Sequence, residues 1–173
     1  VTIAAIWDTI IDIFNKDGKL PPVLLLQLDN TSKQCKGQFL LGFLALLVSW
    51  GIFDKVIVGF LPVGHTHEDI DQFFSRISFF MRHHPAMTRQ AFGKCVQSSY
   101  TKNGASPTVR HWDSVSNISD WIAPHLGDMA GISEYKHIKI VRINSSDGVP
   151  EVRMMFRDSP GSVDPMDKWR GPR

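Results

Sequence analysis

The sequence predicts an α/β fold, and three observations support this assignment. Short apolar runs bounded by turn residues occur at residues 23–28 and 55–60, as expected of buried strands. Helical spacing of apolar residues occupies the segments before, between and after these runs. The resulting order of helix, strand, helix, strand, helix is the one that builds a layered fold on a parallel sheet.

The first two elements follow from local patterns. Apolar residues from Ile3 to Phe14 recur every three or four positions, which predicts an amphipathic helix that ends near Asp17 and Gly18. Val23 to Leu28 is almost wholly apolar, which predicts a strand covered on both faces.

The next three elements are equally local. Residues 38–50 predict a buried helix that stops at Gly51, and residues 55–60, rich in Val and Ile, predict a second strand. Residues 68–82 again show helical spacing, and Pro85 ends that helix.

The apolar run from Phe39 to Phe53 is the one segment that invites a membrane interpretation. It is shorter than the roughly 20 residues that a spanning helix needs, and Gly42 and Ser49 interrupt it. We therefore expect a packed helix and no membrane association. Two cysteines without a paired pattern, and no signal peptide, favour the nucleus or cytosol over secretion.

The remaining half predicts a small α+β appendage. A helix is expected at 88–100, a short helical piece at 118–126, and two strands at 136–143 and 151–156. Asp147-Gly148 between the two strands is a hairpin signal. The predicted division is a core at 1–86, an extension at 87–157 and a flexible tail at 158–173.

Two polar clusters follow the two predicted strands, where α/β sheets place their ligands. The first contains Asp29, and the second, from Gly64 to Asp71, packs five ionisable groups into eight residues. Carboxylates that converge from two strand ends can bind a hard cation, Mg²⁺ or Mn²⁺.

Each cluster also has a structural explanation. Asp29 with Asn30 suits a turn or a helix cap. Glu68 near a helix start interacts favourably with the helix dipole. His65 and His67 are either surface residues or, with Asp71, ligands of a transition metal. Only the combination of both clusters favours a functional site.

The stretches Leu25–Asn30 and Phe60–Ser75 resemble an uncharacterised domain of eukaryotic transposon-derived proteins. That domain is in turn similar to the RNase H-like catalytic cores of DDE transposases and retroviral integrases. The resemblance implies that residues 1–86 form a partial RNase H-like core. It implies that Asp29 is the second catalytic acid and Asp71 the third, with Glu68 as the competitor.

In the same family the first acid lies on a strand before the first helix, where this chain begins. The resemblance therefore implies an N-terminally truncated fragment, inactive by itself.

Basic residues near the two clusters predict contacts with a nucleic acid, DNA in the first instance. Lys33 and Lys36 flank the first cluster, and Arg76 and Arg82 follow the second on its helix. A solvated helix face explains the two arginines equally well. The predicted hairpin carries further cations, which suit nucleic acid but are also ordinary on an exposed sheet face: Lys136, Lys139, Arg142, Arg153 and Arg157.

Three functions remain open from the sequence. The first is a transposase- or integrase-like core for metal-dependent phosphoryl transfer on nucleic acid, with or without homo-oligomerisation. The second is a domesticated relative that binds nucleic acid or protein without catalysis. The third is a hydrolase whose metal is held by His65, His67 and Asp71. The formal net charge of +2 does not discriminate between them.

Overall fold

A computed structural model describes residues 2–28, 37–60, 69–100, 107–127, 129, 132–144 and 150–157. The chain forms two compact units, residues 1–63 together with 115–173, and residues 64–114. The predicted tail at 158–173 and the predicted hairpin turn at 145–149 lie outside the described residues.

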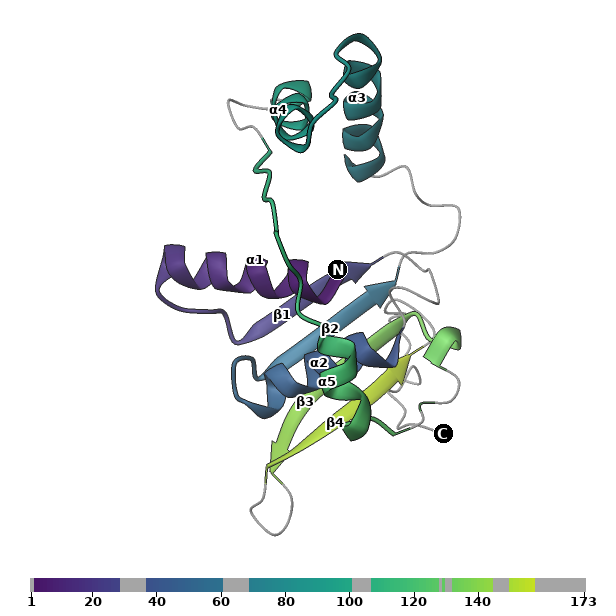
Figure 1. Cartoon of the computed structure of the whole chain (residues 1–173). Helices are drawn as coiled ribbons and strands as arrows, with labels where there is room; N and C mark the ends of the chain where they lie inside the picture. Colours follow the sequence, from purple (N-terminus) through teal and green to yellow (C-terminus); the bar gives the residue numbers. More distant parts are fainter. Residues whose placement is uncertain are drawn as a thin grey trace. The chain divides into compact units, whose positions relative to one another are not determined.

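The predicted α/β class and the predicted helices and strands are confirmed (Figure 1). The first unit contains α1 (Thr2–Asp17), β1 (Val23–Leu28), α2 (Gln38–Ser49), β2 (Lys55–Phe60), α5 (Ile118–Ile122), η1 (Ala123–His125), η2 (Ile132–Glu134), β3 (His137–Asn144) and β4 (Pro150–Arg157). The second unit contains α3 (Asp69–His83) and α4 (Arg89–Ser99). No helix in the described part of the chain is both long and apolar enough to cross a bilayer.

The four strands form one sheet in the order β1-β2-β3-β4. β1 and β2 are parallel, and their register pairs Val23 with Lys55 and Leu28 with Phe60. β3 is antiparallel to β2, and β4 is antiparallel to β3. The sheet is therefore mixed rather than parallel, and the hairpin extends it instead of forming an appendage. The pairing of β2 with β3 causes this, because it aligns the apolar positions of both strands on one face.

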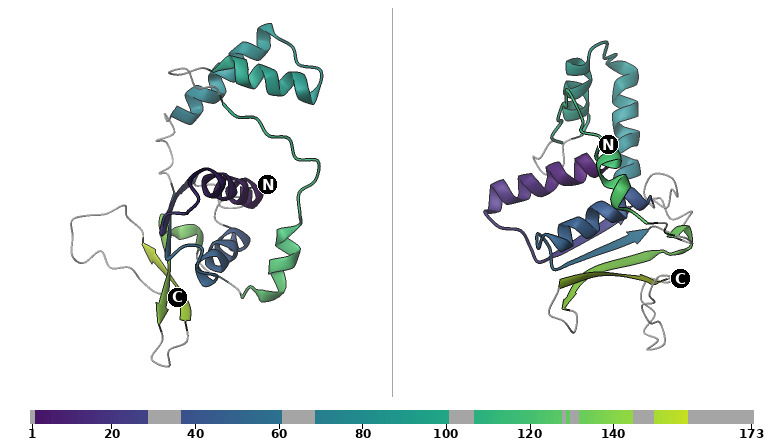
Figure 2. Two further views of the ribbon diagram at one scale, coloured as in Figure 1. Left: turned by 90° about the vertical axis from the view of Figure 1, so that its left-hand side faces the viewer. Right: turned by 60° about the horizontal axis from the view of Figure 1, so that its bottom comes forward.

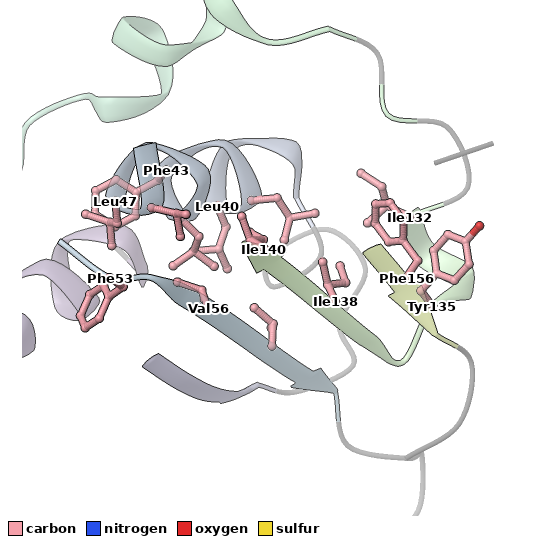
Figure 3. Packing of buried hydrophobic residues seen from close by; sticks show 14 of the residues in the cluster. Leu40, Phe43, Leu47, Phe53, Val56, Ile132, Tyr135, Ile138, Ile140 and Phe156 are labelled. Atoms are coloured by element: carbon pink, nitrogen blue, oxygen red, sulfur yellow. The ribbon is translucent and has the colours of Figure 1, made fainter. Parts of the chain in front are cut away.

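α1 and α2 lie on the same face of the sheet (Figure 2). α2 carries the largest share of the core, and Leu41, Leu44 and Leu47 are fully buried. Figure 3 shows α2 side chains such as Leu40 and Leu47 over the buried residues of β2 and β3. Trp7 of α1 meets Phe43 edge to face, with 6.2 Å between the ring centroids, which packs α1 against α2. The predicted buried helix is therefore confirmed.

The end of α2 is fixed by a glycine and by a distant arginine. Gly51 has φ +72°, a left-handed conformation that costs glycine little and other residues more. Arg142 of β3 donates from Nη2 to the carbonyl oxygens of Val48 and Ser49, at 3.2 and 2.7 Å. The Val48 oxygen also accepts a hydrogen bond from the Gly51 amide at 3.1 Å, and a cation near the last carbonyl oxygens of a helix is favourable for the helix dipole. Arg142 thus caps α2.

The predicted coverage of β1 on both faces is wrong. Leu24, Leu26 and Leu28 pack against the core, whereas Leu25 on the opposite face is 70% exposed. β2 alternates in the same way, because Val56 and Val58 are completely buried while Ile57 between them is only partly buried. An almost wholly apolar strand usually has helices on both faces. Here the helices of the first unit cover one face (Figure 2).

We call the other side of the sheet the open face. It presents the alternate residues that begin at Val23, Lys55, His137 and Glu151, and none of the described residues on it is buried. Lys55 of β2, Lys139 of β3 and Arg157 of β4 lie on it in successive strands. Burial lowers the pKa of Lys139, and the positive charges of Lys55 and Arg157 lower it further. The open face is therefore electropositive.

In the second unit, α3 and α4 contact each other through aromatic residues. Phe73 of α3 meets Tyr100 edge to face at 5.3 Å between centroids, and the Arg76 guanidinium lies 5.3 Å from the centre of the same ring. Gly93 of α4 is buried, and a Cβ there would lie 3.1 Å from Nε2 of His111. The small residue therefore lets the segment after α4 pass close to the helix.

Thr88 starts α4, since its hydroxyl oxygen accepts a hydrogen bond from the Ala91 amide at 3.1 Å. We expect Thr88→Ala to destabilise the second unit by about 1 kcal/mol, because an amide of the first turn loses its acceptor. Thr88→Ser keeps the hydroxyl acceptor, so it should change the stability of the second unit by no more than about 0.3 kcal/mol. Amide hydrogen exchange of α4 measures both effects, and equal exchange in Thr88→Ala and Thr88→Ser would contradict the cap.

Candidate functional site

The carboxyl ends of β1 and β2 lie side by side (Figure 1). Leu28 and Phe60, the last residues of the two strands, are register partners, so they are separated by about one strand spacing, roughly 5 Å. Asp29 is bonded to Leu28, and the cluster that begins at Gly64 follows Phe60 after a short connection. The chain therefore leaves β1 and β2 at the same edge of the sheet.

Six of the predicted site residues lie outside the described residues. These are Asp29, Lys33, Lys36, His65, His67 and Glu68. The three others, Asp71, Arg76 and Arg82, belong to α3 in the second unit. Where the Asp29 and Asp71 carboxylates lie relative to each other stays a prediction.

α3 does not bring its three candidate residues together. Asp71 lies in its first turns and Arg82 in its last turn, roughly 16 Å apart along an axis that rises about 1.5 Å per residue. Both side chains are exposed. Arg76 is also exposed, and its guanidinium lies over Tyr100 in the contact between the helices. A local role for Arg82 is available as well, because a cation in the last turn interacts favourably with the helix dipole.

The end of α3 also accounts for a neighbouring histidine. The His84 ring stacks on Phe80 with 4.0 Å between centroids and an interplanar angle of 9°. Its Nδ1 lies 3.1 Å from the Phe80 carbonyl oxygen, which also accepts a hydrogen bond from the His84 backbone amide at 3.1 Å. His84 therefore has a structural role at this helix end.

The donor chemistry of the candidate site suits a hard cation. Asp29, Glu68 and Asp71 supply carboxylate oxygens, which Mg²⁺ and Mn²⁺ prefer, whereas His65 and His67 suit zinc better. Within the described ranges, no group of three or more His, Cys, Asp or Glu side chains is placed to hold a metal ion.

A cavity of about 770 Å³ lies elsewhere in the first unit, between α2, α5, η1 and β4. Its walls are mainly apolar and include Trp50 and Trp121, whose ring centroids are 6.3 Å apart. At Gly42, which also lines the cavity, a Cβ would overlap the side chain of Leu126. Of the predicted site residues that the structure describes, Asp71, Arg76 and Arg82, none lines this cavity.

Sequence reasoning missed the basic group on the open face. It grouped five hairpin cations together, but the structure uses Arg142 to cap α2 and places Lys139, Arg153 and Arg157 on the open face. Lys55 joins these three from β2, far away in the sequence. Strand alternation alone puts Arg153 and Arg157 on the same face of β4. The register of β3 with β4 adds Lys139 to that face, and the pairing of β2 with β3, which adds Lys55, is not local and leaves no sequence signal.

Comparison with known proteins assigns the chain to a family but finds no individual protein that matches it. No curated protein and no solved structure matches the chain. Residues 1–158 match the family described as a domain of unknown function, DUF7869. The match includes the elements of both units, from α1 to β4. The chain therefore belongs to the DUF7869 family.

Proposed function

We propose that the chain contributes two acids to an RNase H-like core for metal-dependent phosphoryl transfer on nucleic acid, of the transposase and integrase kind. The observation that supports this most is the pairing of Leu28 with Phe60 in parallel β1 and β2. Ligands of open α/β sheets bind beyond the carboxyl ends of such strands.

In this proposal Asp29 is the second acid and Asp71 the third, with Glu68 as the competitor. Together they hold Mg²⁺ or Mn²⁺ through carboxylate oxygens. The bound ions supply activation of the attacking oxygen and stabilisation of the leaving oxygen. Because aspartate is one methylene shorter than glutamate, Asp71 must approach the ion more closely than a glutamate at the same position.

The edge of the described sheet agrees with a further strand beside β1. β1 is the first strand in the order of the described sheet, so one side of its backbone has no partner strand among the described residues. Apolar edge strands are templates for additional pairing. The resemblance implies a first acid on another strand, and a parallel strand beside β1 would bring that acid to the same edge as Asp29.

Manganese broadening of amide signals tests the metal site in the isotopically labelled chain. We expect the amides of Leu28, Phe60 and Asp71 to broaden together at the lowest Mn²⁺ concentrations, because broadening by the paramagnetic ion falls steeply with distance. Asp29→Asn should raise the Mn²⁺ concentration at which these amide signals broaden by about tenfold or more, since one charged ligand is lost.

Asp54→Asn is the matched control, because this exposed acid lies just before β2, at the opposite end of the strand. It should leave the broadening unchanged. Sharp Leu28 and Phe60 signals at Mn²⁺ concentrations that broaden other acidic regions would refute the site. Broadening of Leu28 and Phe60 without Asp71 would exclude Asp71 and leave Glu68, which Glu68→Gln then tests.

A binding module without catalysis is the second candidate, and the electropositive open face favours it. A chain that binds nucleic acid but shows no Mn²⁺ site at the carboxyl ends of β1 and β2 would support this module. Zinc that perturbs the His65 and His67 ring signals and is retained after dialysis would instead support the hydrolase.

A further inference from the structure

The open face carries a row of cations that the proposed metal site does not use. Lys55, Lys139 and Arg157 follow one diagonal across it, because Lys139 pairs with Ile57 in β2 and with Met155 in β4. Lys55 and Arg157 each lie two positions from these partners, on the same face. Diagonal neighbours in a sheet are about 7–8 Å apart, so the row spans roughly 15 Å.

Charge on this face is mainly positive. The acid Glu151 lies 3.9 Å from Arg153, which also belongs to the open face. Among the described residues of this face, the four cations Lys55, Lys139, Arg153 and Arg157 stand against the one acid Glu151. Burial, and after it the positive charges of Lys55 and Arg157, lower the pKa of Lys139, and a phosphate beside this row would favour the charged form of the lysine.

The shape of the face limits the kind of polyanion. The major groove of a DNA duplex admits a helix or a two-stranded ribbon, whereas this face is four strands wide. A single nucleic-acid strand can instead lie along the diagonal, with one phosphate beside each of the three cations. Between the cations lie aliphatic side chains such as Ile57 and Met155, which the sugars and bases can contact.

We infer that the open face of the sheet binds single-stranded nucleic acid, with its phosphates along Lys55, Lys139 and Arg157. The inference rests on the proposed function for the choice of nucleic acid among polyanions. It names the form of that substrate and a surface for it, and it requires no metal.

Fluorescence anisotropy with a labelled 30-nucleotide oligothymidine in EDTA tests this surface. We expect binding to weaken with salt, with a slope of about −2 in log K against log salt, since each phosphate contact on a single strand adds about −0.7. The triple variant Lys55→Gln, Lys139→Gln, Arg157→Gln should bind about tenfold or more weakly at low salt and lose most of that slope.

The control removes the same charge elsewhere: Lys16→Gln, Lys19→Gln and Lys94→Gln, three exposed lysines outside the sheet. It should keep most of the affinity and the slope. Lys139→Gln alone is the second variant if the triple variant does not fold, and it should reduce the slope by about 0.7. Equal binding by wild type and the open-face variants, or an equal loss in the control, would overturn the inference.

Competition experiments distinguish single-stranded nucleic acid from other polyanions that could bind the open face. A 30-nucleotide oligouridine should compete with oligothymidine, because both present the same phosphates. A 30-base-pair duplex that competes better would refute a single-strand site. Stronger binding to phosphatidylserine vesicles than to either oligonucleotide would overturn the choice of nucleic acid.

Metal binding and binding of single-stranded nucleic acid are tested independently. The anisotropy assay contains EDTA, so its outcome does not depend on the Mn²⁺ site. Oligothymidine binding by Asp29→Asn at wild-type strength, together with a lost Mn²⁺ site, would confirm that the two surfaces are separate. Loss of oligothymidine binding in Asp29→Asn would place the strand at the carboxyl ends of β1 and β2 and overturn the open-face assignment.

Discussion

Val58→Asp is expected to unfold the first unit. Val58 is completely buried in β2, on the face that α1 and α2 cover, and its register partner Ile138 in β3 is also completely buried. A carboxylate there loses its hydration without a polar partner, and the valine contacts are lost as well. We expect a cost of about 4 kcal/mol or more, which is a large part of the stability of a domain of this size.

Ile57→Asp is the matched control, one residue away on the same strand. Ile57 lies on the open face, is only partly buried and has Lys139 as its register partner. The new carboxylate stays hydrated and faces a cation, so the remaining cost is the low strand preference of aspartate, about 1 kcal/mol.

Urea unfolding followed by circular dichroism measures both variants. We expect Ile57→Asp to unfold cooperatively near the wild-type midpoint and Val58→Asp to lack a folded baseline. Similar losses in the two variants would mean that both faces of β2 are covered, as the sequence predicted for the first strand.

Gly51→Ala is expected to destabilise the first unit by about 2–3 kcal/mol. Its φ of +72° costs a residue with a Cβ about 1–2 kcal/mol. The added Cβ would also lie 2.8 Å from Nη2 of Arg142, the atom that donates to the last carbonyl oxygens of α2. Displacing that cap adds about 1 kcal/mol.

Gly18→Ala separates the two contributions. Gly18 follows α1 with a similar φ of +69°, and nothing lies within 4 Å of its Cβ position. This variant should therefore cost only the backbone part, about 1–2 kcal/mol. The difference between the two urea midpoints then reports the Arg142 cap.

Arg142→Met in both backgrounds checks that attribution. In the wild type it should cost about 1 kcal/mol, and in Gly51→Ala much less, because the cap is already displaced. Equal costs in the two backgrounds would show that Gly51 and Arg142 act separately.

The sequence predicted the helices and strands correctly because their signals lie in neighbouring residues. The three- and four-residue spacing of α1, the apolar run of α2 and the Asp-Gly between the last two strands each act over a few neighbouring residues. The stop of α2 at Gly51 was equally readable, since glycine tolerates the left-handed conformation. The role of Arg142 was not, because its acceptors are more than 90 positions away in the sequence.

The candidate site also has features that the sequence predicted and features that it did not. The positions of Asp29 and of the cluster from Gly64 to Asp71 after two strands were visible in the sequence, and the pairing of Leu28 with Phe60 supports their common edge. The coverage of β1 was predicted wrongly, since an apolar run does not reveal how many helices lie against it.

By itself, then, the sequence determined which segments become helices and strands and which residue types follow each strand, because those depend on neighbours along the chain. Only the tertiary structure decided which face of the sheet stays open, and that Lys55 shares it with Lys139 and Arg157. Strand order and register set these features through contacts between segments that are distant in the chain, and local propensity carries no record of such contacts.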